Sequence, residues 1–410
     1  MRQVFAAALA ACLGFASVHA IAGDRHASAS VSIQVGDRPA FLIDGMDESA
    51  LKRKLASCSN DLVRRTKFSI AHRGAPLQFP EHTKEAYTAG ARQGAGIVEC
   101  DVTFTKDGAL VCRHDECDLH TTTNIVNTPL NASCTTPWSG ANSGPRCCAS
   151  DITLAEFKTL KGKMDASLPS ATTAAAYLGG TAAWRTDLYI SRGTLLTFKE
   201  SIQLNQKLGV GHTPELKAGN PARVNAVFGS QANYAQALID ELKRAGVNPK
   251  DAWPQSFNLD DVLHWVRNEP RFGKQAVYLD DVDPSSGFPR LTVAELQSLK
   301  TNGVRIFAPP IPALLAVDAA NNKLIPSQYA NDIKAAGLGI ITWSFERSDL
   351  RRGAAFGGFY AAYDPQGLVV KKDSDMYLAL DALARDVRVL GVFSDWPATV
   401  SYYASCLGLE

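Results

Sequence analysis

The feature that most constrains the fold is a regular alternation of short apolar segments with helical segments, which begins near residue 67. We predict eight strands, at residues 68–71, 97–102, 210–216, 253–257, 275–279, 304–308, 339–343 and 391–394. Nearly continuous apolar runs such as QAVYL and LGIITW are typical of parallel strands that are buried on both faces. Eight strand–helix units predict an α/β fold, a (β/α)8 TIM barrel. A doubly wound open sheet is the alternative, although the sequence has no glycine-rich phosphate loop for its switch point.

Local signals place helices between these strands. In a capping box, a threonine and a glutamate three residues later bond each other's backbone at a helix start. Such pairs occur at Thr153/Glu156, Thr197/Glu200 and Thr292/Glu295. Glycine commonly takes the left-handed conformation that ends a helix, and it follows the helical patterns at positions 94, 209, 246, 303 and 337.

We assign the barrel to residues 67–410, including an insertion. Three segments of the chain are additional to the strand–helix units of this barrel. Residues 1–20 combine Arg2, an apolar stretch and a Val18-His19-Ala20 cleavage pattern, and they predict a secretory signal peptide. Residues 21–66 are a predicted N-terminal extension. Residues 115–195 interrupt the alternation between the second and third strands, and we predict a cysteine-rich insertion there, with one helix near 152–163.

The cysteine content agrees with export. The chain has nine cysteines, and cleavage after residue 20 would remove Cys12 and leave an even number. An even number in an exported chain favours disulfides, and the lack of a CxxC pair argues against structural zinc. We therefore predict a secreted or periplasmic protein whose disulfide pairing the sequence leaves open.

Charge and hydropathy limit the partners. Lysine and arginine total 42 and aspartate and glutamate total 41, which gives a formal net charge of +1. A balance this close supplies no basic field for nucleic acid. No apolar run after the N-terminus is long enough to be a transmembrane segment. The sequence leaves the oligomeric state open.

Acidic residues gather where two neighbouring strands end, which is where barrel enzymes place their active residues. Glu99 and Asp101 are two apart in the second strand and so share one face, and Glu215 and Lys217 do the same in the third. Buried carboxylates are costly unless a metal or a basic group compensates them. Three oxygen ligands without cysteine or histidine favour Ca²⁺ or Mg²⁺. A cluster neutralised by arginine and lysine is the alternative.

Two histidines are expected at the same end of the barrel. His72 follows the first strand in a His-Arg-Gly sequence, and His114 stands in a His-Asp pair after the second. Imidazoles titrate near neutral pH and can act as general acid and base. Arg73 and Lys217 supply positive charge suited to a phosphate. With a divalent metal, these residues predict hydrolysis of a phosphate ester, whereas a nucleotide-dependent kinase would need a phosphate loop.

Together these motifs resemble the glycerophosphodiester phosphodiesterase family. The matching segments are HRG (72–74), PEHT (80–83), VECDV (98–102), TKDG (105–108), LVCRHD (110–115), PELK (214–217), QSF (255–257), ITWSF (341–345) and GVFSDWP (391–397). The resemblance extends over roughly residues 67–399, with the cysteine-rich segment inserted. One departure is His82, where the family usually has asparagine.

The resemblance implies a phosphoric diester hydrolase that releases glycerol 3-phosphate and an alcohol from glycerophosphodiesters, with Ca²⁺ or Mg²⁺ bound. The implied roles are metal binding by Glu99, Asp101 and Glu215, acid–base catalysis by His72 and His114, and substrate binding by Arg73, Lys217 and Trp343. One alternative is a lipid-directed phosphodiesterase of the phospholipase D or sphingomyelinase D kind. Another is a barrel without catalysis that only binds phosphodiesters.

Overall fold

The computed structural model describes residues 31–186, 189, 192–282, 290–352 and 358–410. The predicted signal peptide, residues 1–20, lies outside the described residues. A search of the described helices finds none with the length and apolar character needed to cross a membrane.

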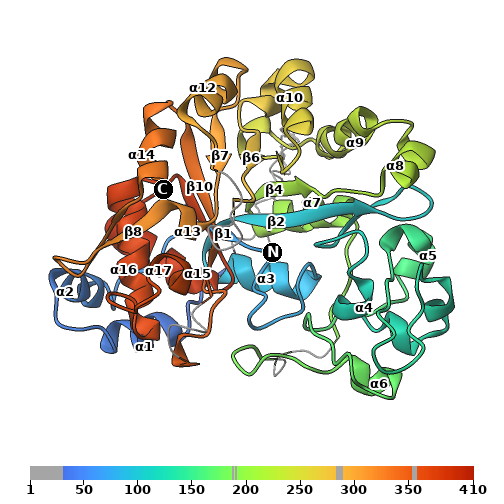
Figure 1. Cartoon of the computed structure of the whole chain (residues 1–410), viewed down its shortest axis with the longest axis horizontal. Helices are drawn as coiled ribbons and strands as arrows, with labels where there is room; N and C mark the ends of the chain where they lie inside the picture. Colours follow the sequence, from blue (N-terminus) through green and yellow to red (C-terminus); the bar gives the residue numbers. More distant parts are fainter. Residues whose placement is uncertain (1–30, 187–188, 190–191, 283–289, 353–357) are drawn as a thin grey trace, which may run out of the picture.

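Within the described residues, eight parallel strands close into a barrel (Figure 1). They follow each other around it in chain order: β1 (Thr66–Ala71), β2 (Ala95–Phe104), β4 (Gly211–Leu216), β5 (Gln255–Ser256), β6 (Val277–Leu279), β7 (Ile306–Ala308), β10 (Gly339–Phe345) and β11 (Gly391–Ser394). β1 pairs with both β2 and β11, which closes the sheet on itself. The predicted (β/α)8 barrel is therefore confirmed, and each predicted strand overlaps an observed one.

Helices surround the strands. They are α3 (Lys84–Arg92), α7 (Phe198–Leu208), α8 (Pro221–Phe228), α9 (Gln231–Arg244), α10 (Leu259–Asn268), α11 (Pro270–Gly273), α12 (Val293–Thr301), α13 (Ile311–Leu314), α14 (Gln328–Ala335), α15 (Phe359–Tyr363), α16 (Met376–Asp381) and α17 (Pro397–Leu407). The three threonine capping boxes all form. A small apolar cluster fills the barrel interior, made of Ile70, Ile97, Val277, Leu279, Ile306, Ala308, Ile341 and Phe393.

Two hairpins are present that the sequence pattern did not predict. β3 (Leu110–Cys112) pairs antiparallel with the end of β2, and β8 (Leu315–Asp318) pairs with β9 (Lys323–Pro326). Strands of three or four residues are stable only against the rest of the fold, so their short patterns carry little signal.

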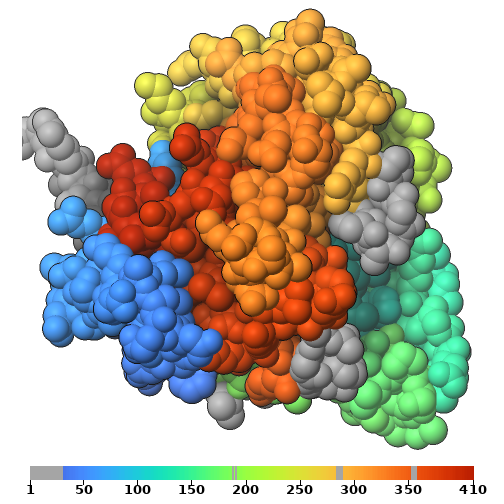
Figure 2. Space-filling view, turned by 60° about the vertical axis from the view of Figure 1, so that its left-hand side comes forward, coloured from blue at the N-terminus to red at the C-terminus, as the bar shows by residue number. Residues whose placement is uncertain are grey.

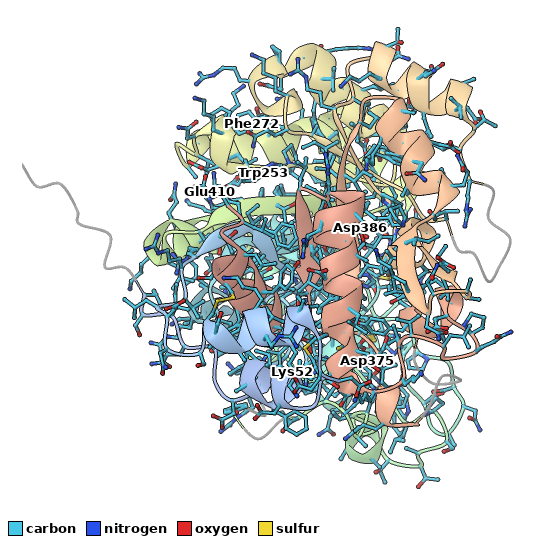
Figure 3. The ribbon with its side chains drawn as sticks, turned by 90° about the vertical axis from the view of Figure 1, so that its left-hand side faces the viewer. Lys52, Trp253, Phe272, Asp375, Asp386 and Glu410 are labelled. Atoms are coloured by element: carbon cyan, nitrogen blue, oxygen red, sulfur yellow. A yellow bond between two sulfur atoms is a disulfide. The ribbon has the colours of Figure 1, made fainter. Side chains whose placement is uncertain are left out.

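The N-terminal extension packs against the C-terminal part of the chain. Its helices α1 (Arg38–Asp44) and α2 (Ala50–Ser57) lie beside the C-terminal helices in Figures 2 and 3. Figure 3 labels Lys52 and Asp375 on the two sides of this contact. The disulfide between Cys58 and Cys406 joins α2 to α17. The extension is therefore fixed to the barrel by a covalent bond.

The segment between β3 and α7 forms a unit beside the barrel, at the lower right of Figure 1. It contains α4 (Leu119–Thr122), α5 (Leu154–Phe157), α6 (Ala174–Tyr177) and its own apolar cluster. The helix expected near 152–163 is only the short α5. Beyond α5, the backbone N–H of Lys161 donates to Oδ1 of Asn124 instead of continuing a helix. Two disulfides, Cys117–Cys148 and Cys134–Cys147, cross-link this unit, and Cys112 pairs with Cys100 of the barrel.

Candidate active site

Three buried carboxylates meet at the carboxyl ends of β2 and β4. The parallel register places Asp101 opposite Glu215, and alternation puts Glu99 on the same face as Asp101. One oxygen from each side chain lies within 4.8 Å of the others. The barrel thus brings together the three acidic residues that the sequence analysis selected.

The charge of this cluster is only partly compensated. Burial, followed by repulsion from Asp101 and Glu215, raises the pKa of Glu99 well above its usual value. Burial likewise raises the pKa of Glu215 to about 7. Asp101 behaves differently: burial opposes its ionisation, but the charges of His82 and Lys217 outweigh it and lower its pKa. The raised pKa values of two of the three carboxyl groups show that Arg73 and Lys217 offset the burial of the cluster only in part.

Within the part of the chain that the structure describes, one buried oxygen of the cluster has no hydrogen-bond partner. Oδ1 of Asp101 is buried and accepts no hydrogen bond within the described residues, while Oδ2 accepts one from Nε2 of His82 at 2.9 Å. An unpaired buried carboxylate oxygen is costly. Three hard oxygen donors, one of them unpaired, fit Ca²⁺ or Mg²⁺.

The two predicted histidines both line the cavity beside this cluster, but they are held differently. Nδ1 of His72 lies 2.5 Å from Oδ1 of Asp395, and its Nε2 lies 3.7 Å from Oε2 of Glu99. Burial lowers the pKa of His72 to about 4, against the opposing charge of Asp395. Burial, and then the charges of Arg73 and Lys217, lower the pKa of His114 well below its usual value. Both imidazoles are therefore neutral at neutral pH.

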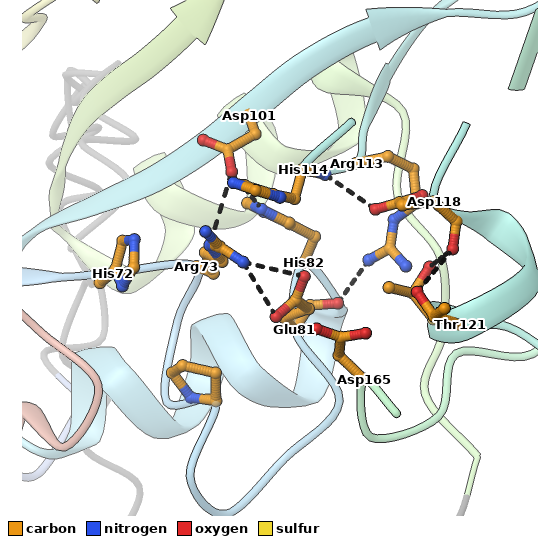
Figure 4. Close-up of polar contacts among 12 residues, drawn as sticks. His72, Arg73, Glu81, His82, Asp101, Arg113, His114, Asp118, Thr121 and Asp165 are labelled. Carbon is orange, nitrogen blue, oxygen red and sulfur yellow. Dashed lines mark hydrogen bonds and ion pairs between the residues drawn. The ribbon is translucent and has the colours of Figure 1, made fainter. Parts of the chain in front are cut away.

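Arg73 is placed by a tight turn after β1. Its φ is 55° and that of Gly74 is 99°, and a Cβ on Gly74 would lie 2.6 Å from the backbone of Ala86. This turn aims the Arg73 backbone N–H at Glu99, 2.9 Å away. Figure 4 shows the Arg73 guanidinium between Asp101 and Glu81, whose two oxygens are both 3.3 Å from Nη1.

Lys217 and Trp343 complete the set of predicted residues. Nζ of Lys217 donates to Oε1 of Glu215 at 2.6 Å. The indole N–H of Trp343 donates to the carbonyl of Ala308, which leaves the ring against the cavity. The cavity has a volume of about 290 Å³, and its lining contains both charged and apolar side chains. Its lining comprises His72, Arg73, Glu99, His114, Glu215, Lys217, Phe257, Leu279, Trp343, Ser344, Arg347, Phe359 and Phe393.

Several partners of these residues were not predicted from the sequence. Asp395 accepts from His72 and forms an ion pair with Nε of Arg347 at 2.8 Å. Gln255 donates to Oε1 of Glu99 at 2.9 Å. The SDWP and QSF segments contain Asp395 and Gln255 at strand ends, so their positions were visible in the sequence while their partners were not.

Comparison with known proteins identifies the family. The sequence profile of the glycerophosphoryl diester phosphodiesterase family matches residues 72–399, which is most of the chain. The chain belongs to this family. An "Extracellular protein" of Arthroderma benhamiae is 43% identical over 248 residues, which cover 60% of this chain and 100% of that protein. A glycerophosphodiester phosphodiesterase of Arabidopsis thaliana is 27% identical over 82% of this chain and 85% of its own length.

Solved structures agree on the fold. A Silicibacter pomeroyi protein named for the same activity superimposes with a TM-score of 0.54 at 20% identity, covering 85% of this chain and 95% of that one. At this identity the likeness concerns the barrel alone. Membership of the glycerophosphoryl diester phosphodiesterase family, together with the cavity described above, makes the chain an enzyme of phosphodiester hydrolysis.

Proposed function

We propose that this protein hydrolyses glycerophosphodiesters to glycerol 3-phosphate and an alcohol, with one bound Ca²⁺ or Mg²⁺. The observation that carries the proposal is the cluster of Glu99, Asp101 and Glu215 in one cavity with two histidines. A divalent cation bound there would supply the positive charge that neutralises a phosphate oxygen. The family relation supports the substrate class.

The positive side chains of the cavity would orient the phosphodiester. Arg73 and Lys217 each already pair with a carboxylate, so they are held in place before substrate arrives. Prepositioned cations stabilise the charge that develops on a phosphate without reorganising during the reaction. The ring of Trp343, fixed through its N–H, would lie against the carbon chain of the substrate.

The two histidines would move the protons. If Nδ1 of His72 donates to Asp395, its Nε2 is left as the acceptor and faces Glu99 and the cavity. His72 would therefore take the proton from the attacking hydroxyl, whether that belongs to water or to the glycerol of the substrate. His114 would give a proton to the leaving alcohol, because a bound phosphate anion raises the pKa of a neighbouring imidazole.

Substitution of the histidines tests this mechanism. We expect His72→Ala and His114→Ala each to reduce turnover of glycerophosphocholine by about 100-fold or more, the usual contribution of a general acid or base. His264→Ala is the matched control, because that histidine lies on α10 and bonds Gln236 outside the cavity. Near-normal turnover by either cavity variant would show that the two-histidine mechanism is wrong.

Removal of metal tests the cofactor. Treatment with EDTA should abolish hydrolysis, and addition of Ca²⁺ or Mg²⁺ should restore it. The Glu99→Gln variant keeps the shape of the side chain but loses its charge, so it should require far more metal for the same rate. Full activity in chelator would exclude the metal-dependent reaction.

The alcohol group and the lipid-directed alternative call for a substrate panel. Turnover of glycerophosphocholine, glycerophosphoethanolamine, glycerophosphoinositol and an intact lysolipid should be compared at equal metal concentration. Preference for the lysolipid, with choline released, would favour a phospholipase D kind of enzyme. No hydrolysis of any substrate would favour a barrel that only binds.

We further propose that the protein is exported and that residues 1–20 are removed in the process. The mature chain would then consist of an extension (21–66) and a barrel (67–410) that carries an insertion (115–195). The four disulfides support an oxidising location. The name of the Arthroderma benhamiae relative supports it too. N-terminal sequencing of the protein recovered outside the cytoplasm should begin at Ile21, and a product that retains residues 1–20 would contradict cleavage there.

A further inference from the structure

His114 differs from His72 in what holds its ring. The imidazole of His72 is anchored by Asp395. Within the part of the chain that the structure describes, no hydrogen bond holds the imidazole of His114, and the residue is fixed through its backbone N–H, 3.1 Å from Oδ2 of Asp118. The position of the His114 ring therefore depends on the backbone that leads into it.

That backbone emerges from a very short strand. β3 has three residues, and Cys112 lies opposite Val102 of β2 at its end. One further bond continues the ladder, from the N–H of Arg113 to the carbonyl of Asp101 at 2.8 Å. β3 forms few hydrogen bonds with β2, and on its other side the N–H of Cys112 donates to the carbonyl of Leu196 at 3.1 Å. A covalent restraint at this point would therefore add to a small set of hydrogen bonds.

The disulfide between Cys100 and Cys112 supplies such a restraint. Cys100 lies between Glu99 and Asp101 in β2, and because side chains alternate along a strand its sulfur lies on the face away from the cavity. Cys112 comes two residues before His114. The two Cα atoms are 5.3 Å apart, and both side chains are buried. A covalent bond thus joins the strand of the carboxylates to the segment that carries His114.

We propose that the Cys100–Cys112 disulfide is a positioning element of the active site, which sets His114 against the carboxylate cluster. The inference rests on the proposed function, because it requires that His114 takes part in catalysis. The carboxylates depend on the disulfide less, since β2 and β4 pair over six positions that include Asp101 and Glu215. Loss of the disulfide should therefore lower turnover and leave metal affinity unchanged.

A second disulfide provides a matched control. The first double variant, Cys100→Ala with Cys112→Ala, removes a disulfide that closes a loop of sequence separation 12. The second, Cys134→Ala with Cys147→Ala, removes a disulfide in the insertion that closes a loop of sequence separation 13. Because the loops are nearly equal in length, the entropic model predicts equal falls in melting temperature. We expect kcat to fall about 10- to 100-fold in the first pair, the effect of a misplaced catalytic group. KM and the Ca²⁺ dissociation constant from calorimetry should be unchanged in both pairs, and kcat should be unchanged in the second.

A double-mutant cycle isolates the ring of His114. In a His114→Ala background, loss of the Cys100–Cys112 disulfide should cause no further fall in kcat, because no ring remains to be positioned. Equal falls in kcat for the two cysteine pairs, or the same fall with and without His114, would overturn the proposal. A fully active His114→Ala variant would show that His114 takes no part in catalysis, which overturns the two-histidine mechanism and this proposal with it but leaves the hydrolytic activity itself standing. If the alanine pair does not fold, Cys100→Ala with Cys112→Val, which refills more of the buried volume, is judged by the same criteria.

Discussion

The pair formed by His72 and Asp395 offers the sharpest test of the site. Replacing Asp395 by asparagine preserves its shape but removes the charge that accepts from Nδ1 of His72. Burial already lowers the pKa of His72 to about 4 against the opposing charge of Asp395. Without that charge the pKa falls further, His72 becomes a weaker base, and the amide can turn its N–H₂ toward the ring and favour the wrong tautomer.

The size of the effect follows from the bond that is lost. A hydrogen bond to a charged, buried group contributes about 1.5–3 kcal/mol. At about 1.4 kcal/mol for each factor of ten, Asp395→Asn should lower kcat about 10- to 150-fold. Arg347, which also lines the cavity, loses its ion-pair partner in the same variant, and the Nε that forms this pair is buried. The range above is therefore the effect of the His72 bond alone, to which the loss of the Arg347 ion pair adds.

The assay is the steady-state rate with glycerophosphocholine, measured beside the Ca²⁺ dissociation constant. Asp395 is outside the carboxylate cluster, so metal affinity should not change. Asp261→Asn is the control, because Asp261 is equally buried and accepts from Ser256 and Gln231 on the outer side of the barrel. If Asp395→Asn retains more than half of the wild-type kcat, the assignment of His72 as the oriented base is wrong.

Four further predictions concern the metal cluster and the scaffold. Because the pKa of Glu215 is raised to about 7, protons compete with metal, and Ca²⁺ affinity should rise from about pH 6 to about pH 8 more steeply than in Glu215→Gln. Without metal, the native state binds more protons at Glu215 than the unfolded chain does between about pH 4.5 and about pH 7. The contribution of Glu215 to the free energy of unfolding is therefore lost as pH rises through about 7. A melting temperature that rises over this range relative to Glu215→Gln would contradict it. Gly74→Ala should cost about 1–3 kcal/mol of unfolding free energy, because φ is 99° and the new Cβ meets the backbone of Ala86, and an unchanged denaturation midpoint would refute this. Replacing Cys58 and Cys406 by alanine should cost about 2–5 kcal/mol in a chemical denaturation curve and leave kcat unchanged, and a large loss of kcat would show that the extension acts on the site.

Much of the fold could be predicted from the sequence because its signals are local. Most barrel strands are buried on both faces and are therefore short, mainly apolar runs, although β4 and β5 contain polar residues. Capping threonines and terminal glycines mark the helices between the strands. The hairpins β3 and β8–β9 were missed because strands of three or four residues have no pattern long enough to distinguish them from loops.

The residues of the candidate site could be predicted from the sequence, but the contacts between them could not. Alternation along a strand put Glu99 with Asp101, and the barrel rule put Glu215, His72 and His114 at the same end. Their partners were not predictable. Asp395 is 323 residues from His72 in sequence, and no local signal links the two.

The sequence by itself therefore determined the eight barrel strands, favoured a closed barrel over an open sheet, and placed the candidate site residues at strand ends, because periodicity and strand ends are local properties of a chain. Among the described residues, the tertiary structure alone decided which cysteines pair, which carboxylate oxygen is left without a partner, and that His72 is anchored while the His114 ring is not. These depend on distances of a few ångströms between segments far apart in sequence. Such distances are set only when β1 pairs with both β2 and β11 and the barrel closes.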